Sequence, residues 1–270
     1  MQFHPSPLLL ERTRSTWRRE TAAAETAAET ARTHAPAGPI TETDLEGLPA
    51  QIQRYLRFTG TVGRPRVAGF RARMTGAIRQ GADSPWMPME ARQLSVLSPS
   101  IRLFWMRAAR AGLPFHALHR FVGEHAHFRV RLLDLFTLVD AHGDWLDQSE
   151  TVTIFNDLCL LAPAGLVGAP VTWQALDGDR VLGTYTRGAH RVSAVLAFGD
   201  RGELVDWESE DRYRGSSDQD RVLQRWSTPV QGYADFAGRT VARQAEARWT
   251  EPTGEFAYAR FDLQELSYLS

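Results

Sequence analysis

The chain has 270 residues, of which 43% are hydrophobic, and this is enough to bury a substantial core in one domain. A formal net charge of -1 argues against nucleic-acid binding through bulk electrostatics. The single Cys159 excludes an intramolecular disulfide and a cysteine-built zinc site.

The N-terminal region is expected to be an extension rather than a domain. Met1–Leu10 lacks the apolar stretch of a signal peptide and no segment has the length of a transmembrane helix, so a cytoplasmic protein is predicted by default. Residues 15–32 favour a helix but lack an apolar stripe with which to dock, and residues 35–39 are typical of a linker. We predict a low-complexity, loosely ordered or helical extension over residues 1–42 and a single curved-sheet domain over residues 43–270.

The domain is predicted to begin with a short helix, because Leu48, Ile52 and Tyr55 recur at helical spacing and Gly60 follows. From Pro65 onward the hydrophobic period changes to two, which is the period of a strand. Further strands are expected near residues 87–97, 101–109, 115–122, 125–133 and 135–141.

One helix, predicted over residues 148–162, interrupts the strands. Asp147 and Glu150 have the spacing of a capping box, with Asp147 as the N-cap and Glu150 at the third helical position. Most of the circumference of this helix is apolar, which indicates burial. Its polar residues form one stripe: Glu150, Thr153, Asn156 and Asp157.

A second series of strands is expected near residues 171–176, 180–187, 190–198, 203–214, 221–229, 240–250 and 256–268. In the fourth of these, Val205, Trp207 and Tyr213 alternate with charged residues, as in a strand with one apolar face. Without a βαβ rhythm, the pattern predicts an α+β fold of mostly antiparallel strands. A large curved sheet would wrap around the central helix, with a short helix at the N-terminal end.

Large apolar side chains are the candidate ligand-binding wall, because adjacent Trp and Met residues suit an adaptable surface, although most such residues belong to ordinary cores. The candidates are Trp86, Met87, Phe104, Trp105 and Met106, with Phe155 from the helix. Glu150 and Asn156 are candidate polar contacts for a ligand head group. The alternative, which the capping spacing favours, is that Glu150 caps its own helix while Asn156 and Asp157 satisfy strand or loop amides.

Four histidines lie within twelve positions, and two of them, His125 and His127, would share one face of a strand, as in some metal sites. No third ligand is identifiable from the sequence, so histidines on a strand surface are the preferred interpretation. We predict no metal and no other cofactor. The sequence has neither a Gly-x-Ser-x-Gly elbow nor a Gly-rich phosphate loop after a strand, and no catalytic residue is assigned.

Several segments together resemble an uncharacterised bacterial family of domains of unknown function. They are Leu48-Pro49, Arg54–Gly60, Val62–Pro65, Trp86–Pro88, Val139–Ala141, Glu150–Pro163, Asp211–Tyr213 and Trp226–Pro229. The resemblance covers about residues 45–268. It implies a half-barrel of the lipoprotein-localisation-factor (LolA) type with a helical plug and an apolar cavity. Proteins of that shape tend to carry or sense lipid-like ligands, and family members often carry an N-terminal membrane anchor.

The favoured function is therefore non-catalytic binding or carriage of an apolar or amphipathic, lipid-like molecule in a cavity between sheet and helix. A hydrolase-like or acid/base enzyme that uses Glu150 and Asp157 is one alternative. A structural or partner-binding module is the other. A lipid-like small molecule is the expected partner, and no nucleic acid is expected.

Overall fold

A computed structural model of the protein describes residues 11–32 and 38–269. The expectations for Met1–Leu10, and most of the linker expected over residues 35–39, lie outside these residues. The helices are α1 (Glu11–Arg32), α2 (Ala50–Phe58) and α3 (Asp144–Leu161), with short 3₁₀ helices η2 (Thr43–Leu45) and η3 (Pro163–Leu166). In the described ranges no helix combines the length and the apolar character that crossing a bilayer requires.

The strands form two consecutive series on either side of α3. Before α3 come β1 (Gly69–Ile78), β2 (Met87–Val96), β3 (Ile101–Arg110), β4 (Leu113–Val122), β5 (His125–Leu132) and β6 (Phe136–His142). After it come β7 (Val171–Ala175), β8 (Arg180–Arg187), β9 (His190–Phe198), β10 (Leu204–Ser209), β11 (Tyr213–Arg214), β12 (Val222–Leu223), β13 (Trp226–Ser227), β14 (Val230–Phe236), β15 (Arg239–Glu251) and β16 (Gly254–Leu269).

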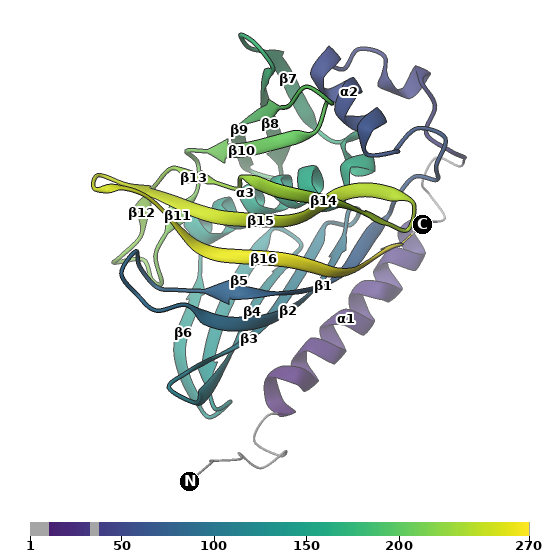
Figure 1. Cartoon of the computed structure of the whole chain (residues 1–270). Helices are drawn as coiled ribbons and strands as arrows, with labels where there is room; N and C mark the ends of the chain where they lie inside the picture. Colours follow the sequence, from purple (N-terminus) through teal and green to yellow (C-terminus); the bar gives the residue numbers. More distant parts are fainter. Residues whose placement is uncertain (1–10, 33–37, 270) are drawn as a thin grey trace.

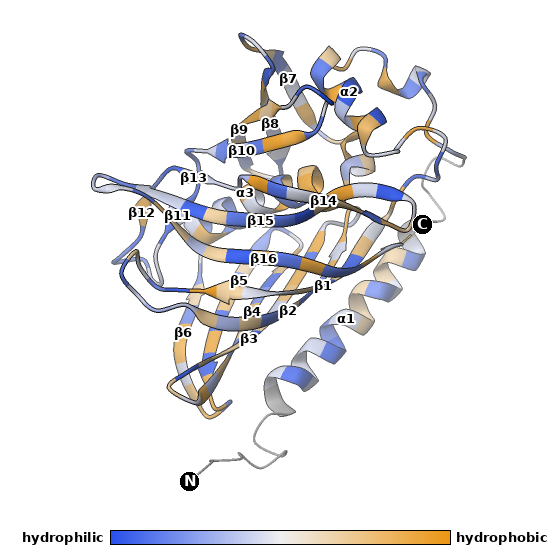
Figure 2. Cartoon of the chain, in the orientation of Figure 1, coloured by the Kyte–Doolittle hydropathy of each residue, from blue (hydrophilic) through white to orange (hydrophobic). Residues whose placement is uncertain are grey.

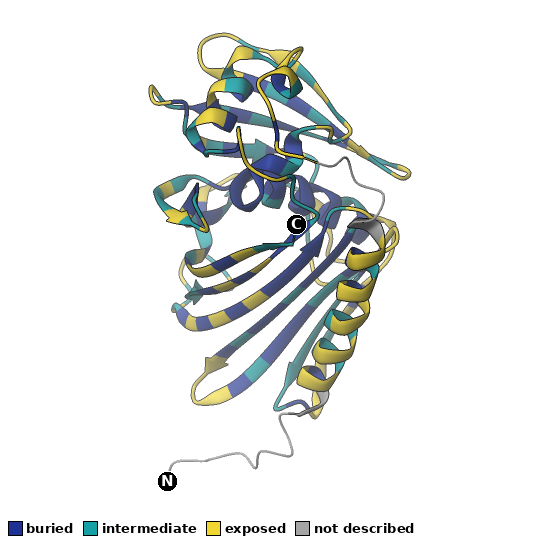
Figure 3. Ribbon diagram, turned by 90° about the vertical axis from the view of Figure 1, so that its right-hand side faces the viewer, coloured by how far each residue is buried: buried dark blue, intermediate teal, exposed yellow. Residues whose placement is uncertain are grey.

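Fourteen of these strands form one open sheet in the order β6-β5-β4-β3-β2-β1-β16-β15-β13-β10-β9-β8-β7, and β14 also pairs with β15. Strands β11 and β12 form a small separate ribbon. The last strand, β16, pairs antiparallel with β1 and so joins the two series into one surface. The long β15 and β16, in yellow, cross the middle of the molecule (Figure 1). The sheet curves around α3, which confirms the predicted fold class (Figure 3).

Helix α3 is buried on opposite sides because the sheet bends around it. Phe155 stacks on Tyr185 of β8 at 5.4 Å between ring centroids and meets Trp207 of β10 edge-on at 5.6 Å. Other residues of the helix face the opposite half of the sheet, where Glu150 contacts Arg102 of β3. Both halves of the sheet therefore position this helix, as the predicted burial requires.

The start of α3 differs from the sequence prediction. The helix begins at Asp144, its N-cap is Gly143 with a φ of 114°, and no side chain caps it. The capping box predicted for Asp147 and Glu150 is wrong, because Gly143 turns the chain from β6 into the helix about one turn earlier. Asp147 lies inside the first turns, and its carboxylate accepts a hydrogen bond of 2.5 Å from the backbone N–H of Ala126.

The second strand series contains two departures from the predicted alternation. The segment expected as one strand over residues 203–214 divides into β10 and β11, and a register shift at Leu204 leaves Val205 39% exposed although Trp207 is fully buried. Strand β14 was not predicted, because two register shifts disrupt its alternation. Elsewhere hydrophilic and hydrophobic residues alternate along many strands, as the period of two predicts (Figure 2).

Of the two α-helices that precede the sheet, α2 agrees with the sequence prediction and α1 does not. Helix α2 forms as predicted, and the hydroxyl of its buried Tyr55 donates a hydrogen bond to the carbonyl of Cys159. Helix α1 lies along the outer face of the sheet (Figures 1 and 3). The expectation that it has no docking surface is wrong, because the small Ala24 and Ala28 pack against Leu94 and Leu103. The division into domains at residue 43 stays a prediction.

Candidate functional site

A cavity of about 330 Å³ lies between α3 and the inner face of the sheet. Ligand pockets typically range from roughly 300 to 1,000 Å³, so this space is large enough for a small molecule. Much of its wall is apolar, and the strands contribute Met74, Met89, Phe104, Met106, Phe128 and Phe261. One side of α3 closes the cavity with polar groups.

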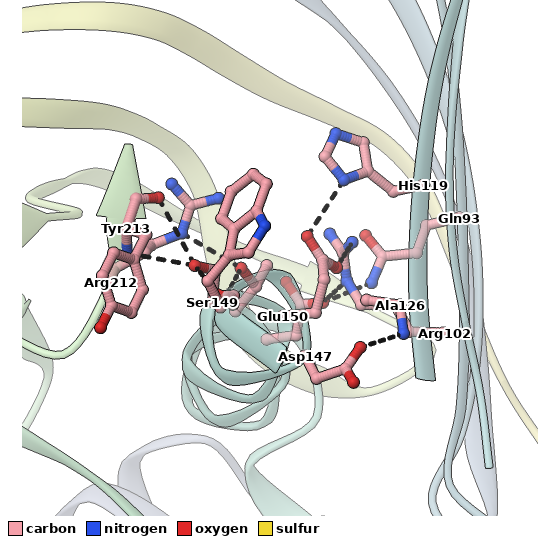
Figure 4. A network of polar contacts seen from close by, with 12 residues as sticks. Gln93, Arg102, His119, Ala126, Asp147, Ser149, Glu150, Arg212 and Tyr213 are labelled. Carbon is pink, nitrogen blue, oxygen red and sulfur yellow. Dashed lines mark hydrogen bonds and ion pairs between the residues drawn. The ribbon is translucent and has the colours of Figure 1, made fainter. Parts of the chain in front are cut away.

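The polar stripe predicted on α3 faces this cavity. Glu150, Thr153, Asn156 and Asp157 all line it, since residues three, six and seven positions apart share a face of a helix. Arg102 reaches from β3 and bridges the two carboxylates. Figure 4 shows Arg102 beside Glu150. Its Nη1 lies 3.0 Å from Glu150 Oε2, and its Nε lies 2.6 Å from Asp157 Oδ2. One guanidinium thus holds two carboxylates that lie two helical turns apart.

Side chains from β2, β4 and the segment after β13 complete this network. Nδ1 of His119 lies 3.0 Å from Glu150 Oε1, and Nε2 of Gln93 donates to Asp157 Oδ2 at 2.6 Å. Asn156 donates to the hydroxyl of Thr228 at 2.6 Å. The alternative in which these groups cap the helix or satisfy backbone amides is therefore wrong. They fasten α3 to the sheet through side chains.

The two carboxyl groups are shifted in opposite directions. Burial disfavours the charge of Glu150, but the adjacent His119 and Arg102 outweigh it and lower its pKa to about 2. Burial dominates at Asp157 and raises its pKa, although Arg102 opposes the shift. Burial lowers the pKa of His119, although the charge of Glu150 and the hydrogen bond between the two side chains oppose this shift.

A second guanidinium lies at the opposite side of the polar face, on the segment between β10 and β11. Arg212 lies over the ring of Trp226 at 4.6 Å and over that of Trp249 at 5.1 Å. Its Nε donates a long hydrogen bond of 3.4 Å to the hydroxyl of Thr153. Trp226 is itself held by a hydrogen bond of 3.1 Å from its Nε1 to the hydroxyl of Tyr258.

The structure brings half of the candidate ligand-binding residues to the cavity. Phe104, Met106, Glu150 and Asn156 line it, whereas Trp86, Met87, Trp105 and Phe155 do not. Successive residues of a strand point to opposite faces, so Trp105 cannot face the cavity that Phe104 and Met106 line. Trp105 instead stacks on His116 with a centroid distance of 5.6 Å.

The remaining three candidates have other packing roles. Phe155 lies on the side of α3 that packs against β7, β8 and β10. Trp86 is flanked by two guanidinium groups, those of Arg79 at 4.5 Å and Arg260 at 4.4 Å. Met87 is buried at the start of β2.

Sequence reasoning missed Gln93, Arg102 and Arg212, and it considered His119 only as a member of the histidine cluster. A signal existed for Arg102, because it shares its side of β3 with Phe104 and Met106 and is therefore a charge on an otherwise apolar, inward face. The positions of Gln93 and His119 on the inner face depend on strand pairing. That of Arg212 depends on the break between β10 and β11.

The four clustered histidines do not come together. Each contacts a separate carboxylate: His116 and Asp134, His119 and Glu150, His125 and Asp147, His127 and Asp140. The expectation of strand-surface histidines is wrong for His116, which is 1% exposed, and for His119, which lines the cavity. Residues 11–32 and 38–269 contain no group of three His, Cys, Asp or Glu side chains suited to a metal ion.

Comparison with curated proteins gives no match. Among solved structures, the chain is similar to a putative outer membrane lipoprotein-sorting protein domain from Vibrio parahaemolyticus, with 11% identity over 74% of this chain and 85% of that chain and a TM-score of 0.38. A DUF1329 family protein from Desulfovibrio piger has 12% identity over 81% of this chain and 92% of that chain, with a TM-score of 0.39. A LolA superfamily protein from Nitrosomonas europaea has 9% identity over 82% of this chain and 92% of that chain, with a TM-score of 0.38. At such TM-scores these likenesses carry no argument about function.

The sequence itself matches a family. Residues 38–261 correspond to the family of unknown function DUF6544, and this range contains nearly all of the sheet and all of α3. The expected membership of an uncharacterised family of domains of unknown function is confirmed. The chain belongs to the DUF6544 family.

Proposed function

We propose that the protein binds a lipid-like, amphipathic small molecule in the cavity between α3 and the sheet, without changing it chemically. The observation that carries this proposal is the contrast between the apolar wall on the strands and the fixed polar groups on α3. A concave, mostly apolar space with a few convergent polar groups is the usual form of a small-molecule site.

The apolar wall favours a flexible ligand. Three of the five methionines of the chain, Met74, Met89 and Met106, line the cavity. Unbranched, polarisable methionine side chains adapt to apolar groups of different shapes. Phe104 and Phe128 add ring surface beside them. This composition supports an alkyl chain as the apolar part of the ligand.

The polar face favours a head group rather than a wholly apolar ligand. Glu150 and Asp157 are held by Arg102, so their charges are compensated before any ligand enters. Thr153 and Asn156 lie beside them on the same face of α3 and add hydroxyl and amide groups. A ligand with one polar end and one apolar end would satisfy both sides of the cavity.

Two measurements on the purified protein test this proposal. Native mass spectrometry and solvent extraction should reveal a copurifying amphiphile, and the neutral apolar probe N-phenyl-1-naphthylamine should fluoresce on binding. The variant Met106→Trp, which fills the cavity, should abolish probe binding. Ala109→Trp adds the same ring at an exposed position of the same strand and should bind normally. A protein that is empty and leaves the probe dark would contradict the proposal.

An acid/base enzyme is the second candidate, and the opposite pKa shifts of Glu150 and Asp157 are the observation that favours it. It ranks lower because Arg102 and Gln93 already hold Asp157 Oδ2, and Arg102 and His119 hold both oxygens of Glu150. Mass spectrometry of an extracted ligand before and after incubation with the protein separates the two candidates. A mass change that Asp157→Asn abolishes would favour the enzyme.

A further inference from the structure

One of the arginines around the cavity differs from the others. Four arginines line it: Arg102, Arg212, Arg214 and Arg243. Three of them form ion pairs: Arg102 with Glu150 and Asp157, Arg214 with Glu251, and Arg243 with Asp262. Within the described ranges, no carboxylate forms an ion pair with Arg212, although this side chain is only partly exposed. A partly desolvated cation is costly without a partner, so a bound anion would stabilise it.

The surroundings of Arg212 fix its orientation without using its hydrogen-bonding capacity. The rings of Trp226 and Trp249 lie 4.6 and 5.1 Å from its guanidinium carbon. Of its five N–H donors, only that on Nε has a partner among the described residues, at 3.4 Å from Thr153 Oγ1. Contact with aromatic faces holds the guanidinium in place, and its free edge keeps the fork geometry that binds a carboxylate or phosphate through two parallel hydrogen bonds.

The carboxylates that line the cavity are paired with groups other than Arg212, although the charge of Arg212 also acts on Glu150. Glu246 is paired with Arg248 and Arg260. Arg102 already neutralises Glu150 and contacts Asp157, and His119 donates to the remaining oxygen of Glu150. Thr153, the hydrogen-bond partner of Arg212, lies on the same face of α3 as Glu150 and Asp157. The Thr153 hydroxyl donates its one proton to the carbonyl of Ser149 at 3.0 Å, so an anion at Arg212 would be bound by the free N–H groups of the guanidinium.

We propose that Arg212 recognises the anionic head group, a carboxylate or a phosphate, of a single-chain amphiphile whose alkyl chain occupies the cavity. The inference rests on the proposed function and narrows it to one charge class. A cavity of about 330 Å³ lies at the small end of the range of roughly 300 to 1,000 Å³ for small-molecule sites, which favours a ligand with a single alkyl chain.

The test measures displacement of N-phenyl-1-naphthylamine from the full-length protein by four ligands with the same chain. These are sodium dodecanoate, dodecyl phosphate and dodecyltrimethylammonium, each below its critical micelle concentration, and dodecan-1-ol below its solubility limit. At least one of the two anions should bind about tenfold or more tightly than dodecan-1-ol, since a charge-assisted hydrogen bond accounts for a difference of this size. The ammonium ligand should bind more weakly than the alcohol.

Variants then assign the preference to one residue. Arg212→Gln should reduce anion affinity to that of dodecan-1-ol and leave the alcohol unchanged. Arg212→Lys, which keeps the charge and loses the planar fork, should retain part of the preference. The matched control Arg243→Gln removes a lining guanidinium that is already paired with Asp262 and should keep the full preference. Melting temperatures establish that each variant is folded.

The outcomes distinguish the inference from the function on which it rests. Two results would overturn the role of Arg212 while leaving the cavity as a binding site. One is that the unmodified protein binds the anions and the alcohol with equal affinity. The other is that folded Arg212→Gln and Arg212→Lys keep the full preference for anions. Binding of neither probe nor ligand would overturn the proposed function itself. Preference for dodecyl phosphate alone, or for dodecanoate alone, would support the inference and identify the head group.

Discussion

Replacement of Arg102 by leucine tests the role of the network on α3. Arg102, Glu150 and Asp157 have side chains that are only 7%, 3% and 14% exposed, so the substitution leaves two buried carboxylates without their counter-charge. Loss of one partner of a buried ion pair typically costs about 3–5 kcal/mol. Two charge-assisted hydrogen bonds at about 1.5–3 kcal/mol each give a similar range. We therefore expect Arg102→Leu to lower the free energy of unfolding by about 3–5 kcal/mol at pH 7.

Urea denaturation followed by tryptophan fluorescence measures this loss. The triple variant Arg102→Leu/Glu150→Gln/Asp157→Asn is the control, because it removes the uncompensated charges and should recover much of the stability. Lowering the pH from 7 to 4 should reduce the difference in free energy of unfolding between Arg102→Leu and the unmodified protein, since protonation neutralises the unpaired carboxylates. The reasoning would be refuted if Arg102→Leu lowered the free energy of unfolding by less than about 1 kcal/mol at pH 7. It would also be refuted if the triple variant were no more stable than Arg102→Leu.

Three other predictions follow from single positions. The pKa of Glu150 falls from 4.5 to about 2 on folding, so its contribution of about 3 kcal/mol is present above pH 4.5 and is lost between pH 4.5 and 2. Urea titrations of Glu150→Gln should lack this acid-dependent loss, and an unchanged pH profile would contradict it. Burial and the nearby Glu208 and Glu255 charges raise the pKa of Asp206 to about 6. Above that pH the ionised carboxylate therefore destabilises the folded state relative to the unfolded state. Asp206→Asn should raise the melting temperature at pH 8 and much less at pH 4.5, whereas an equal shift at both pH values would count against this account. A Cβ on Gly76 would lie 1.8 Å from the carbonyl oxygen of Arg260 across the β1–β16 seam, whereas one on Gly81 would meet only a hydroxyl at 3.7 Å. Gly76→Ala should cost more than about 2 kcal/mol in urea denaturation and Gly81→Ala less than about 0.5, and similar costs would show that the seam is not tightly packed.

Local patterns in the sequence predict most of the secondary structure because strands and helices have distinct hydrophobic periods. Helix α2 forms where Ile52 and Tyr55 recur at helical spacing, and β8 and β9 have the predicted bounds. Errors occur where the backbone departs from a regular period. The register shift near Leu204 exposes Val205, and the positive φ of Gly143 starts α3 before the expected cap.

The site could be predicted only in part, because its key contacts join residues that are distant in sequence. The stripe from Glu150 to Asp157 is visible as a helical pattern, but its partner Arg102 lies 48 and 55 positions away on β3. Which member of an adjacent pair faces the cavity, such as Trp105 or Met106, depends on the orientation of the whole sheet relative to α3. A one-residue change of register would exchange the two faces.

The docking of α1 was missed for a different physical reason. The segment has few large apolar residues, but Ala24 and Ala28 allow close approach to the sheet. Two ion pairs flank this contact, between Glu25 and Arg71 at 2.8 Å and between Glu20 and Arg120 at 2.9 Å. Small side chains and partners on the sheet replace the apolar stripe that a docking helix normally shows.

Titration calorimetry with a series of straight-chain carboxylates from eight to sixteen carbons tests the binding cavity most directly. Each added methylene should tighten binding about fourfold, corresponding to ~0.8 kcal/mol, until the cavity is filled. The gain should then level off, because 330 Å³ holds a chain of limited length. An absence of binding across the series, or affinities independent of chain length, would contradict an apolar binding cavity between α3 and the sheet.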